Sequence, residues 1–286
     1  MATIIPSKAR PAAPWSARRA GDDYGAHDEP DWRSIDWREH LRDVELGGRR
    51  VRYVDLGSGD GPPIVLVHGL SGNWQNWLEN IPRLARERRV VAPDLPGFGE
   101  SDRPAERITM SGYGRTVDEL CEHLDLGEVV LVGNSMGGFV AAEKRMAILR
   151  PRLRHLVFST IMRHPSLISS EMLWEMSNGA GRSAFRPALE AILDYDFRDR
   201  LPDIRCPTLV VWGGEDMLVP VEDAGEYERQ IDGARKTVMK DTGHVPMIER
   251  PPTFNDALLE FVREPRGEQT SDMGEPAAEP AGRVSS

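Results

Sequence analysis

The sequence has little of several features that mark particular classes of protein. It holds two cysteines, fewer basic than acidic residues (36 against 46) and a net charge of -10. Nucleic acids and anionic membrane surfaces attract proteins through basic patches, so this charge disfavours both as partners. No apolar run approaches the roughly 18 uninterrupted residues of a membrane-spanning helix. The sequence therefore predicts no nucleic-acid partner and no membrane span, and it favours a small-molecule substrate.

The cysteines and the N-terminus carry no sign of metal binding or export. Cys121 and Cys206 stand in apolar contexts without CxxC or Cys/His ligand spacing. We interpret them as buried thiols in a reducing compartment rather than as a disulfide or metal ligands. Residues 1–32 contain no apolar stretch long enough for the core of a signal peptide. These features predict a cytoplasmic protein without a bound metal.

Composition divides the chain into a folded body and two tails. Residues 1–35 are rich in Pro, Arg, Asp and Ala with little periodicity, and residues 264–286 are similar. Such segments bury too little apolar surface to offset the entropy lost on ordering, so both are predicted to be disordered. The body between them, residues 36–263, is long enough for one substantial core in a chain with 40% hydrophobic residues.

Within the body, short apolar runs alternate with helical patterns. The predicted strands are residues 51–57, 64–69, 90–94, 126–133, 155–161, 207–213 and 234–240. Helical spacing marks residues 76–87, 116–126, 136–149 and 251–262. Continuous apolar strands separated by helices are typical of a mostly parallel sheet covered on both faces. Reactive groups gather at the carboxyl ends of the strands in such sheets, so a site is expected there.

A serine flanked by glycines follows one of these strands. The sequence LVGNSMGGFV, residues 131–140, places Ser135 between Gly133 and Gly137. A strand-to-helix turn tight enough to present a serine strains the backbone, and side chains at the two glycine positions would collide with neighbouring backbone. Glycines are also common in ordinary turns, so the string needs support from elsewhere in the chain.

That support comes from the ends of two later strands. Asp216 follows the strand at 207–213, and His244 follows the strand at 234–240. A serine hydroxyl is a poor nucleophile unless a base removes its proton, and a carboxylate fixes the tautomer of a histidine base. The chain thus offers nucleophile, acid and base in that order along the sequence.

These motifs resemble those of the α/β-hydrolase family over residues 40 to 263. The resemblance rests on the His-Gly pair at 68, on DLPGFGESDRP, GNSMGG and WGGEDMLVP, and on DTGHVPMIERP. It implies the α/β-hydrolase fold, a mostly parallel sheet with helices on both faces, and no metal or organic cofactor. It implies that Ser135 attacks the substrate, that His244 is the base and that Asp216 orients it. The backbone amides of Leu70 and Met136 would form the oxyanion hole.

Several residues compete for these roles or stand near them. Glu215 and Asp94 are alternatives to Asp216, which matches the family block, whereas Asp94 opens a glycine-rich turn and is interpreted as structural. His68 is expected to hold the loop that carries the oxyanion amide. The remaining histidines are interpreted as tail, surface or packing residues. The candidate substrate pocket consists of Trp74, Asn134 and Phe139, although Trp74 could equally pack the first helix.

The chain departs from the family pattern in its cap, the helical insertion that covers the nucleophile in relatives. Only residues 162–205 separate the strand at 155–161 from the next strand, and no separate strand of the type RVERLVLVS precedes them. Either the cap is shortened, or the chain lacks a core strand and part of the cap. In the second case residues 155–161 must fill the vacant place in the sheet.

The resemblance implies hydrolysis of an ester or similar acyl compound as the first interpretation. GNSMGG also resembles hydrolases that cleave carbon-carbon bonds in ring-fission products of aromatic degradation. Those enzymes need polar groups for a dienoate carboxylate, and no convincing arginine stands out for that role. Related perhydrolase-type activities and a catalytically silent member with an incomplete cap or core are further alternatives. The sequence leaves the oligomeric state open.

Overall fold

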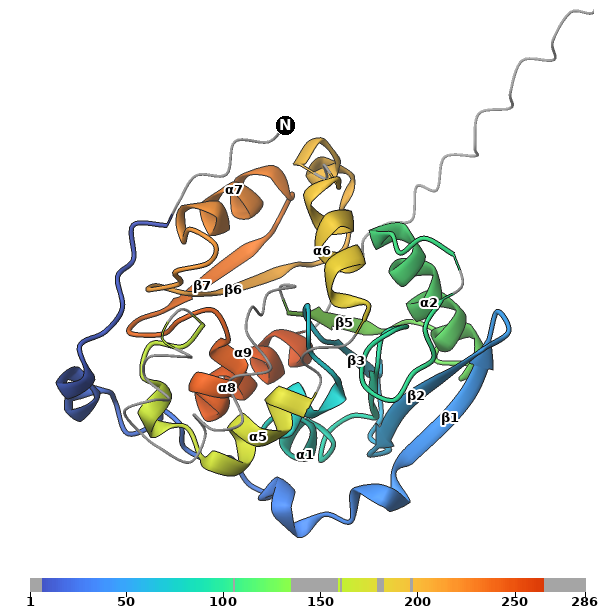
Figure 1. Ribbon diagram of the computed structural model, residues 1–286, viewed down its shortest axis with the longest axis horizontal. Helices are drawn as coiled ribbons and strands as arrows, with labels where there is room; N and C mark the ends of the chain where they lie inside the picture. Colours follow the sequence, from blue (N-terminus) through green and yellow to red (C-terminus); the bar gives the residue numbers. More distant parts are fainter. Residues whose placement is uncertain are drawn as a thin grey trace, which may run out of the picture.

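The strands within the described part of the chain form two sheets. The computed structural model describes residues 7–104, 106–134, 159, 161–178, 183–195 and 198–264. The larger sheet has the order β1-β2-β4-β3-β5, with β1 Leu41–Leu46, β2 Arg49–Leu56, β3 Ile64–Val67, β4 Val90–Pro93 and β5 Val130–Gly133. The smaller sheet pairs β6, Leu209–Gly213, with β7, Arg235–Met239. Figure 1 shows the larger sheet running from β5 and β3 near the centre of the molecule to the β1–β2 hairpin at its right-hand edge.

The pairing register brings polar residues to one edge of the larger sheet. Strands β3, β4 and β5 are parallel, while β1 and β2 form an antiparallel hairpin whose second strand runs antiparallel to β4. Val67 of β3 pairs with Gly133 of β5. The residues that follow these strands, His68 and Asn134, therefore leave the sheet at the same edge.

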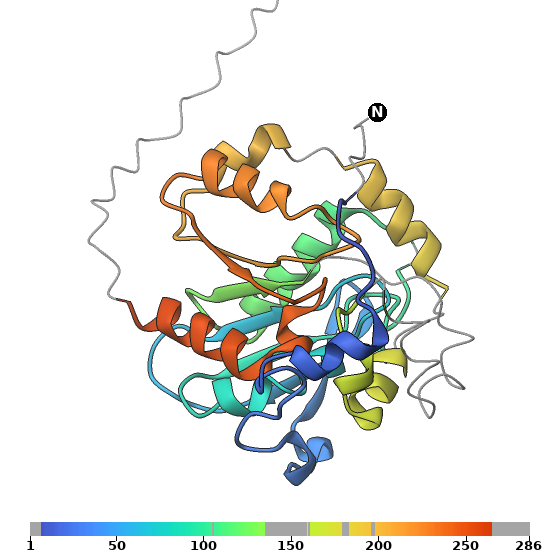
Figure 2. The same ribbon diagram turned by 90° about the vertical axis from the view of Figure 1, so that its left-hand side faces the viewer.

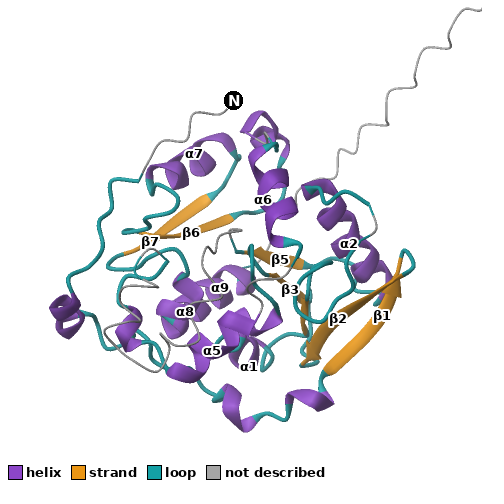
Figure 3. Ribbon diagram, viewed as in Figure 1, coloured by secondary structure: helices purple, strands orange, loops and turns teal. Residues whose placement is uncertain are grey.

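Helices lie beside the strands, while the β1–β2 hairpin forms one outer edge of the molecule (Figure 3). The α-helices are α1 Ile81–Leu84, α2 Met110–His123, α5 Ser170–Asn178, α6 Phe185–Leu193, α7 Glu222–Gln230, α8 Pro246–Glu249 and α9 Pro251–Arg263. The 3-10 helices are η1 Pro14–Arg19, η2 Trp32–Ser34, η3 Trp37–Glu39, η4 Trp74–Trp77, η5 Pro165–Leu167 and η6 Arg198–Asp203. Helix α2 begins where the Thr109 hydroxyl accepts a hydrogen bond from the Gly112 amide. Within the described segments, no helix has the length and apolar character needed to cross a membrane.

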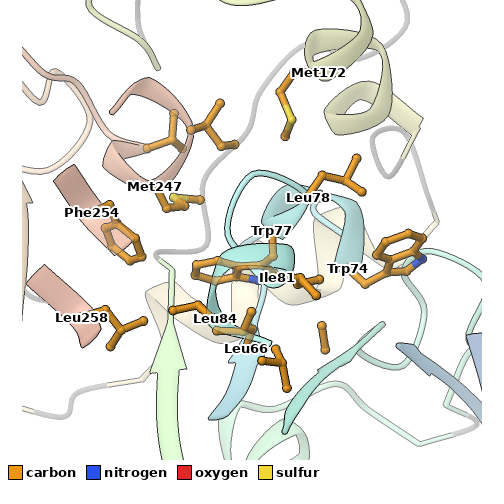
Figure 4. Packing of buried hydrophobic residues seen from close by; sticks show 14 of the residues in the cluster. Leu66, Trp74, Trp77, Leu78, Ile81, Leu84, Met172, Met247, Phe254 and Leu258 are labelled. Carbon is orange, nitrogen blue, oxygen red and sulfur yellow. The ribbon is translucent and has the colours of Figure 1, made fainter. Parts of the chain in front are cut away.

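Side chains of the central strands point alternately to two hydrophobic cores, one on each face of the larger sheet. Ile64 and Leu66 belong to a cluster that includes residues of η4, α1, α8 and α9. Val65 points to the opposite cluster, with residues of α2 and α6. Figure 4 shows the first cluster, in which Trp77 lies among Ile81, Leu84 and neighbouring side chains. Two buried faces explain why these strands read as continuous apolar runs.

The N-terminal segment, residues 7–40, lies against the body of the protein. Figure 2 shows it in blue, passing close to the red helices α8 and α9. Trp32 donates through Nε1 to the Glu79 carboxylate, and His27 lies 2.9 Å from the same group. The sequence predicts disorder over residues 1–35, whereas residues 7–35 make such contacts in the structure. Local composition could not reveal them, because the anchoring partners lie far away in the sequence.

Most predicted elements are found close to their expected positions. The strands expected at 51–57, 64–69, 90–94, 126–133, 207–213 and 234–240 correspond to β2, β3, β4, β5, β6 and β7. The sequence analysis did not predict β1, and the helix expected at 76–87 is reduced to η4 and the short α1. The helix expected at 136–149 and most of the strand expected at 155–161 lie outside the described residues. Cys206, expected to be buried, is exposed.

Among the described residues, no strand joins the two sheets. Strand β5 pairs with β3 alone, and β6 pairs with β7 alone. Leu131 on β5 is 61% exposed, whereas β3 and β4 are largely buried. The carboxyl ends of β6 and β7 nevertheless carry the two polar residues that the sequence singles out. The cap assigned to residues 162–205 remains a prediction.

Candidate active site

A buried histidine and a buried aspartate meet beyond β6 and β7. Asp216 lies in the turn after β6, and His244 lies in the turn after β7. Asp216 Oδ2 is 2.7 Å from His244 Nδ1, and the two residues are 4% and 5% exposed. His244 Nε2 has no hydrogen-bond partner within the part of the chain that the structure describes. An imidazole held in this way keeps Nε2 as an acceptor that can take a proton from a neighbouring hydroxyl or water.

The Asp216 carboxylate is fixed on its other side by backbone donors. Its Oδ1 accepts the amides of Leu218 at 2.8 Å and Val219 at 3.0 Å. The turn thus presents one oxygen to its own backbone and leaves the other for His244.

Glycine residues allow the two turns to approach each other. A Cβ atom at position 213 would lie 1.8 Å from the Gly243 carbonyl oxygen and 2.5 Å from that of Thr242. Real Cβ contacts of this length do not occur, so the end of β6 requires glycine where the histidine turn crosses it. Glu215 extends the contact, because its Oε2 accepts the Thr242 amide at 3.0 Å. The structure therefore pairs Asp216, and not Glu215, with the histidine.

Asp94, the other alternative acid, holds a loop together. It is fully buried, and its carboxylate accepts the Trp74 amide and the Glu100 amide, both at 2.8 Å. A Cβ atom at Gly99, whose φ is +49°, would lie 2.0 Å from this carboxylate. The structural role expected for Asp94 agrees with these contacts.

His68 links the two loops beside the expected oxyanion site. Its Nε2 lies 2.9 Å from the Leu95 amide and accepts that hydrogen bond. Its Nδ1 lies 2.7 Å from the Gly69 carbonyl oxygen, so this nitrogen carries the proton. Burial lowers the pKa of His68 to about 4. The ring is therefore neutral, and it holds the backbone next to Leu70 as the sequence predicts.

The stability of the protein should depend on this neutral histidine. The folded-state pKa lies below the value in unfolded chains, so the contribution is complete above about pH 6.5 and is lost as the pH falls toward 4. Between pH 7 and pH 5, we expect the wild type to lose about 2 kcal/mol more unfolding free energy than His68→Gln. Urea unfolding at both pH values measures this difference, and equal pH dependence in the two proteins would contradict it.

Asp94 changes the stability of the protein in the opposite sense to His68 over the same pH range. Burial raises its pKa to about 6, so the folded protein takes up this proton before the unfolded chain does. The titration of Asp94 therefore raises the free energy of unfolding as the pH falls through 6. For this reason the experiment compares two proteins at two pH values rather than the wild type alone.

The remaining predicted site residues fall into two groups. Ser135, Met136 and Phe139 lie outside the described residues, so their assigned roles stay predictions. Asn134 donates its amide to the Val67 carbonyl oxygen at 3.0 Å at the end of β5. Leu70 and Trp74 are buried, and the Trp74 ring lies 5.1 Å from the Trp37 ring, with the two ring planes tilted by 46°. These contacts agree with a packing role for Trp74, and its role in a pocket remains a prediction.

Sequence reasoning missed a polar network behind His244. Glu249 is fully buried beside the histidine turn, and the Tyr24 hydroxyl donates to it. His164, interpreted as a packing or surface residue, is 2% exposed and lies 2.7 Å from Asp241 through Nε2. The Glu249 position was part of the motif HVPMIERP, but nothing in the sequence pointed to Tyr24.

Two known proteins are similar to this chain over about three quarters of its length. The dihydrolipoyllysine-residue acetyltransferase component of the acetoin cleaving system of Pseudomonas putida is 34% identical over 265 positions, which cover 77% of this chain and 68% of that protein. A 2-hydroxy-6-oxo-6-(2'-aminophenyl)hexa-2,4-dienoic acid hydrolase of Metapseudomonas resinovorans is 30% identical, covering 77% of this chain and 90% of that protein. The first alignment uses about 220 of the 286 residues for its 265 positions, so about 45 positions of the relative have no counterpart here.

Solved structures agree with this similarity. A serine hydrolase involved in carbazole degradation matches with a TM-score of 0.64 and 28% identity, over 77% of this chain and 97% of the other. A thermophilic esterase from Thermogutta terrifontis matches with a TM-score of 0.63 and 26% identity, over 78% and 98%. Residues 64–257 match the model of the alpha/beta hydrolase family. With this match and the mostly parallel, helix-covered strands, the chain belongs to the alpha/beta hydrolase family, and it has the fold that its motifs predict.

Proposed function

We propose that this protein is a serine hydrolase that cleaves esters or similar acyl compounds. The observation that carries the proposal is the buried His244, held at Nδ1 by Asp216 while Nε2 has no partner among the described residues. Membership of a hydrolase family supports it. Ser135 is the proposed nucleophile, because it follows β5 in the sequence at the position that the family motif assigns.

The proposed reaction has two stages, the transfer of the acyl group to Ser135 and the hydrolysis of the acyl-enzyme. Ser135 Oγ bonds to the substrate carbonyl carbon while His244 Nε2 takes the hydroxyl proton. The amides of Leu70 and Met136 stabilise the oxyanion, and the intermediate collapses as His244 returns the proton to the leaving alcohol. A water molecule then attacks the acyl-enzyme with the same base, and it releases the acid and regenerates Ser135.

Labelling of the nucleophile tests this proposal. We expect a fluorophosphonate probe to label the wild type and the protein to hydrolyse short-chain p-nitrophenyl esters. Ser135→Ala should abolish the labelling and lower kcat by at least about 1,000-fold, because the attacking oxygen is removed. Folded wild type that resists the probe would contradict the proposal and favour a catalytically silent member of the family.

Cleavage of carbon-carbon bonds is the second candidate. The dienoic acid hydrolase described above is 30% identical, and the match covers 90% of its length. Such a substrate needs a cation for its carboxylate, but Arg163 is paired with Asp241 and Arg250 with Asp23. These pairings support the ester reaction as our first candidate. A screen of esters and dienoates, run on unlabelled protein from a preparation that reacts with the probe, distinguishes the two, and turnover of dienoates alone would reverse the order.

A further inference from the structure

We propose that Tyr24 in the N-terminal segment is a positioning residue for the His244 base and acts through Glu249. This inference rests on the proposed function, because it assigns a role in orienting the same base. Tyr24 is far from His244 in the sequence and does not touch it. The connection runs through one buried carboxylate and the backbone on either side of the histidine.

Glu249 clamps the turn that carries His244. Its Oε1 accepts the Gly243 amide at 2.9 Å and the Val245 amide at 3.3 Å, so it binds the residues directly before and after the histidine. Its Oε2 accepts the Arg163 amide at 2.7 Å. The His244 amide itself donates to the Ile161 carbonyl oxygen at 2.7 Å. The position of the imidazole is therefore set by backbone groups that converge on Glu249 and on residues 161–163.

The Tyr24 hydroxyl completes the hydrogen bonding of Glu249. It donates to Glu249 Oε2 and accepts the His164 amide at 2.6 Å. Tyr24 is 5% exposed, and burial is the main cause that raises its pKa well above the ordinary value. The hydroxyl thus stays protonated and donates to the carboxylate. A buried carboxylate that loses a donor is left undersolvated and shifts toward other partners.

A second chain of contacts reaches the same turn from the other side. His164 Nε2 lies 2.7 Å from Asp241, three residues before His244, and Arg163 Nε lies 3.1 Å from the same carboxylate. Asp241 has a φ of +51°, in the left-handed region that aspartate adopts more readily than most other non-glycine residues. Through its bonds to Glu249 and the His164 amide, Tyr24 joins the two chains of contacts.

The N-terminal segment is attached strongly enough to hold Tyr24 in place. The Gly25 amide donates to the Glu249 carbonyl oxygen at 2.7 Å. The Asp23 carboxylate accepts the Thr253 hydroxyl at 2.6 Å and forms an ion pair with Arg250. Arg250 also lies over the Tyr24 ring, with its guanidinium carbon 5.1 Å from the ring centroid. Removal of either the Tyr24 hydroxyl or the Thr253 hydroxyl should therefore leave the segment attached.

Two isosteric hydroxyl deletions test the inference. Tyr24→Phe removes the hydrogen bonds of Tyr24 and keeps its ring. Thr253→Val is the matched control, because the hydroxyl that it removes donates to Asp23 of the same segment and not to Glu249. The two readouts are ester kinetics and the downfield proton resonance of the Asp216–His244 hydrogen bond, assigned by its loss in His244→Gln.

We expect Tyr24→Phe to lower kcat about fivefold to tenfold with KM changed less than about twofold, and to broaden the resonance through faster exchange with water. Thr253→Val should keep both kcat and the resonance. The inference is overturned if Tyr24→Phe keeps a sharp resonance, or if Thr253→Val has the same effect. If the wild type hydrolyses no ester, the resonance alone still decides the positioning role, so the failure of the proposed function is distinguishable.

Discussion

Asp216→Asn should lower kcat by about 10,000-fold with little change in KM or in stability. The Leu218 and Val219 amides both donate to Asp216 Oδ1, so asparagine must keep its carbonyl oxygen toward them. Its amide nitrogen then faces His244 Nδ1, where the carboxylate now lies 2.7 Å away. An NH2 group facing Nδ1 makes that nitrogen an acceptor and transfers the ring proton to Nε2. The histidine can then no longer accept a proton from a nucleophile.

The neighbouring carboxylate provides the control for this substitution. Glu215→Gln retains an oxygen that can accept the Thr242 amide, and it removes one negative charge next to Asp216. We expect it to keep kcat within about threefold of the wild type, since surface and near-surface charges act weakly. Rates of p-nitrophenyl ester hydrolysis and thermal unfolding are measured for both variants. An Asp216→Asn enzyme that retains a tenth of the wild-type kcat would rule out this acid.

Gly213→Ala is the second substitution for which we expect a large effect. Its main consequence should be a lower free energy of unfolding. The added Cβ would lie 1.8 Å from the Gly243 carbonyl oxygen, an atom of the backbone that cannot rotate away. Either β6 or the histidine turn must move, and a forced contact of this kind costs about 3 kcal/mol of unfolding free energy. Because the displaced turn carries His244, we also expect a loss of ester hydrolysis.

The adjacent glycine separates this clash from a general cost of alanine. At Gly214 the nearest atom to an added Cβ is the Met239 carbonyl oxygen at 3.3 Å, which asks for only a small adjustment. Gly214→Ala should therefore change the unfolding free energy by less than about 1 kcal/mol. The two variants are compared by urea unfolding. Similar stability of both would show that the turns tolerate separation at β6.

The strands of this protein were predictable because their signal is local. Runs such as IVLV at 64–67 are apolar at every position, since the sheet is covered on both faces, and the structure places β3 there. The β1 hairpin strand escaped prediction because LRDVEL has the mixed pattern of an edge strand with one exposed face. The expected 76–87 helix is divided into η4 and α1 because Pro82, which lies in the first turn of α1, has no amide proton to continue a helix from the preceding residues.

The candidate site also has parts that local sequence predicts and parts that depend on long-range contacts. The sequence by itself determined that Asp216 and His244 follow strands, since the motifs around them are continuous, and parallel strands bring such residues to one edge. The sequence favoured Asp216 over Glu215 only through the family block, and the tertiary structure supplied the physical reason, because Asp216 is directed at His244 and Glu215 at the Thr242 amide. The tertiary structure also placed Tyr24 behind His244. That contact spans 225 positions between Tyr24 and Glu249, and no local pattern encodes a pairing that exists only once the core has closed.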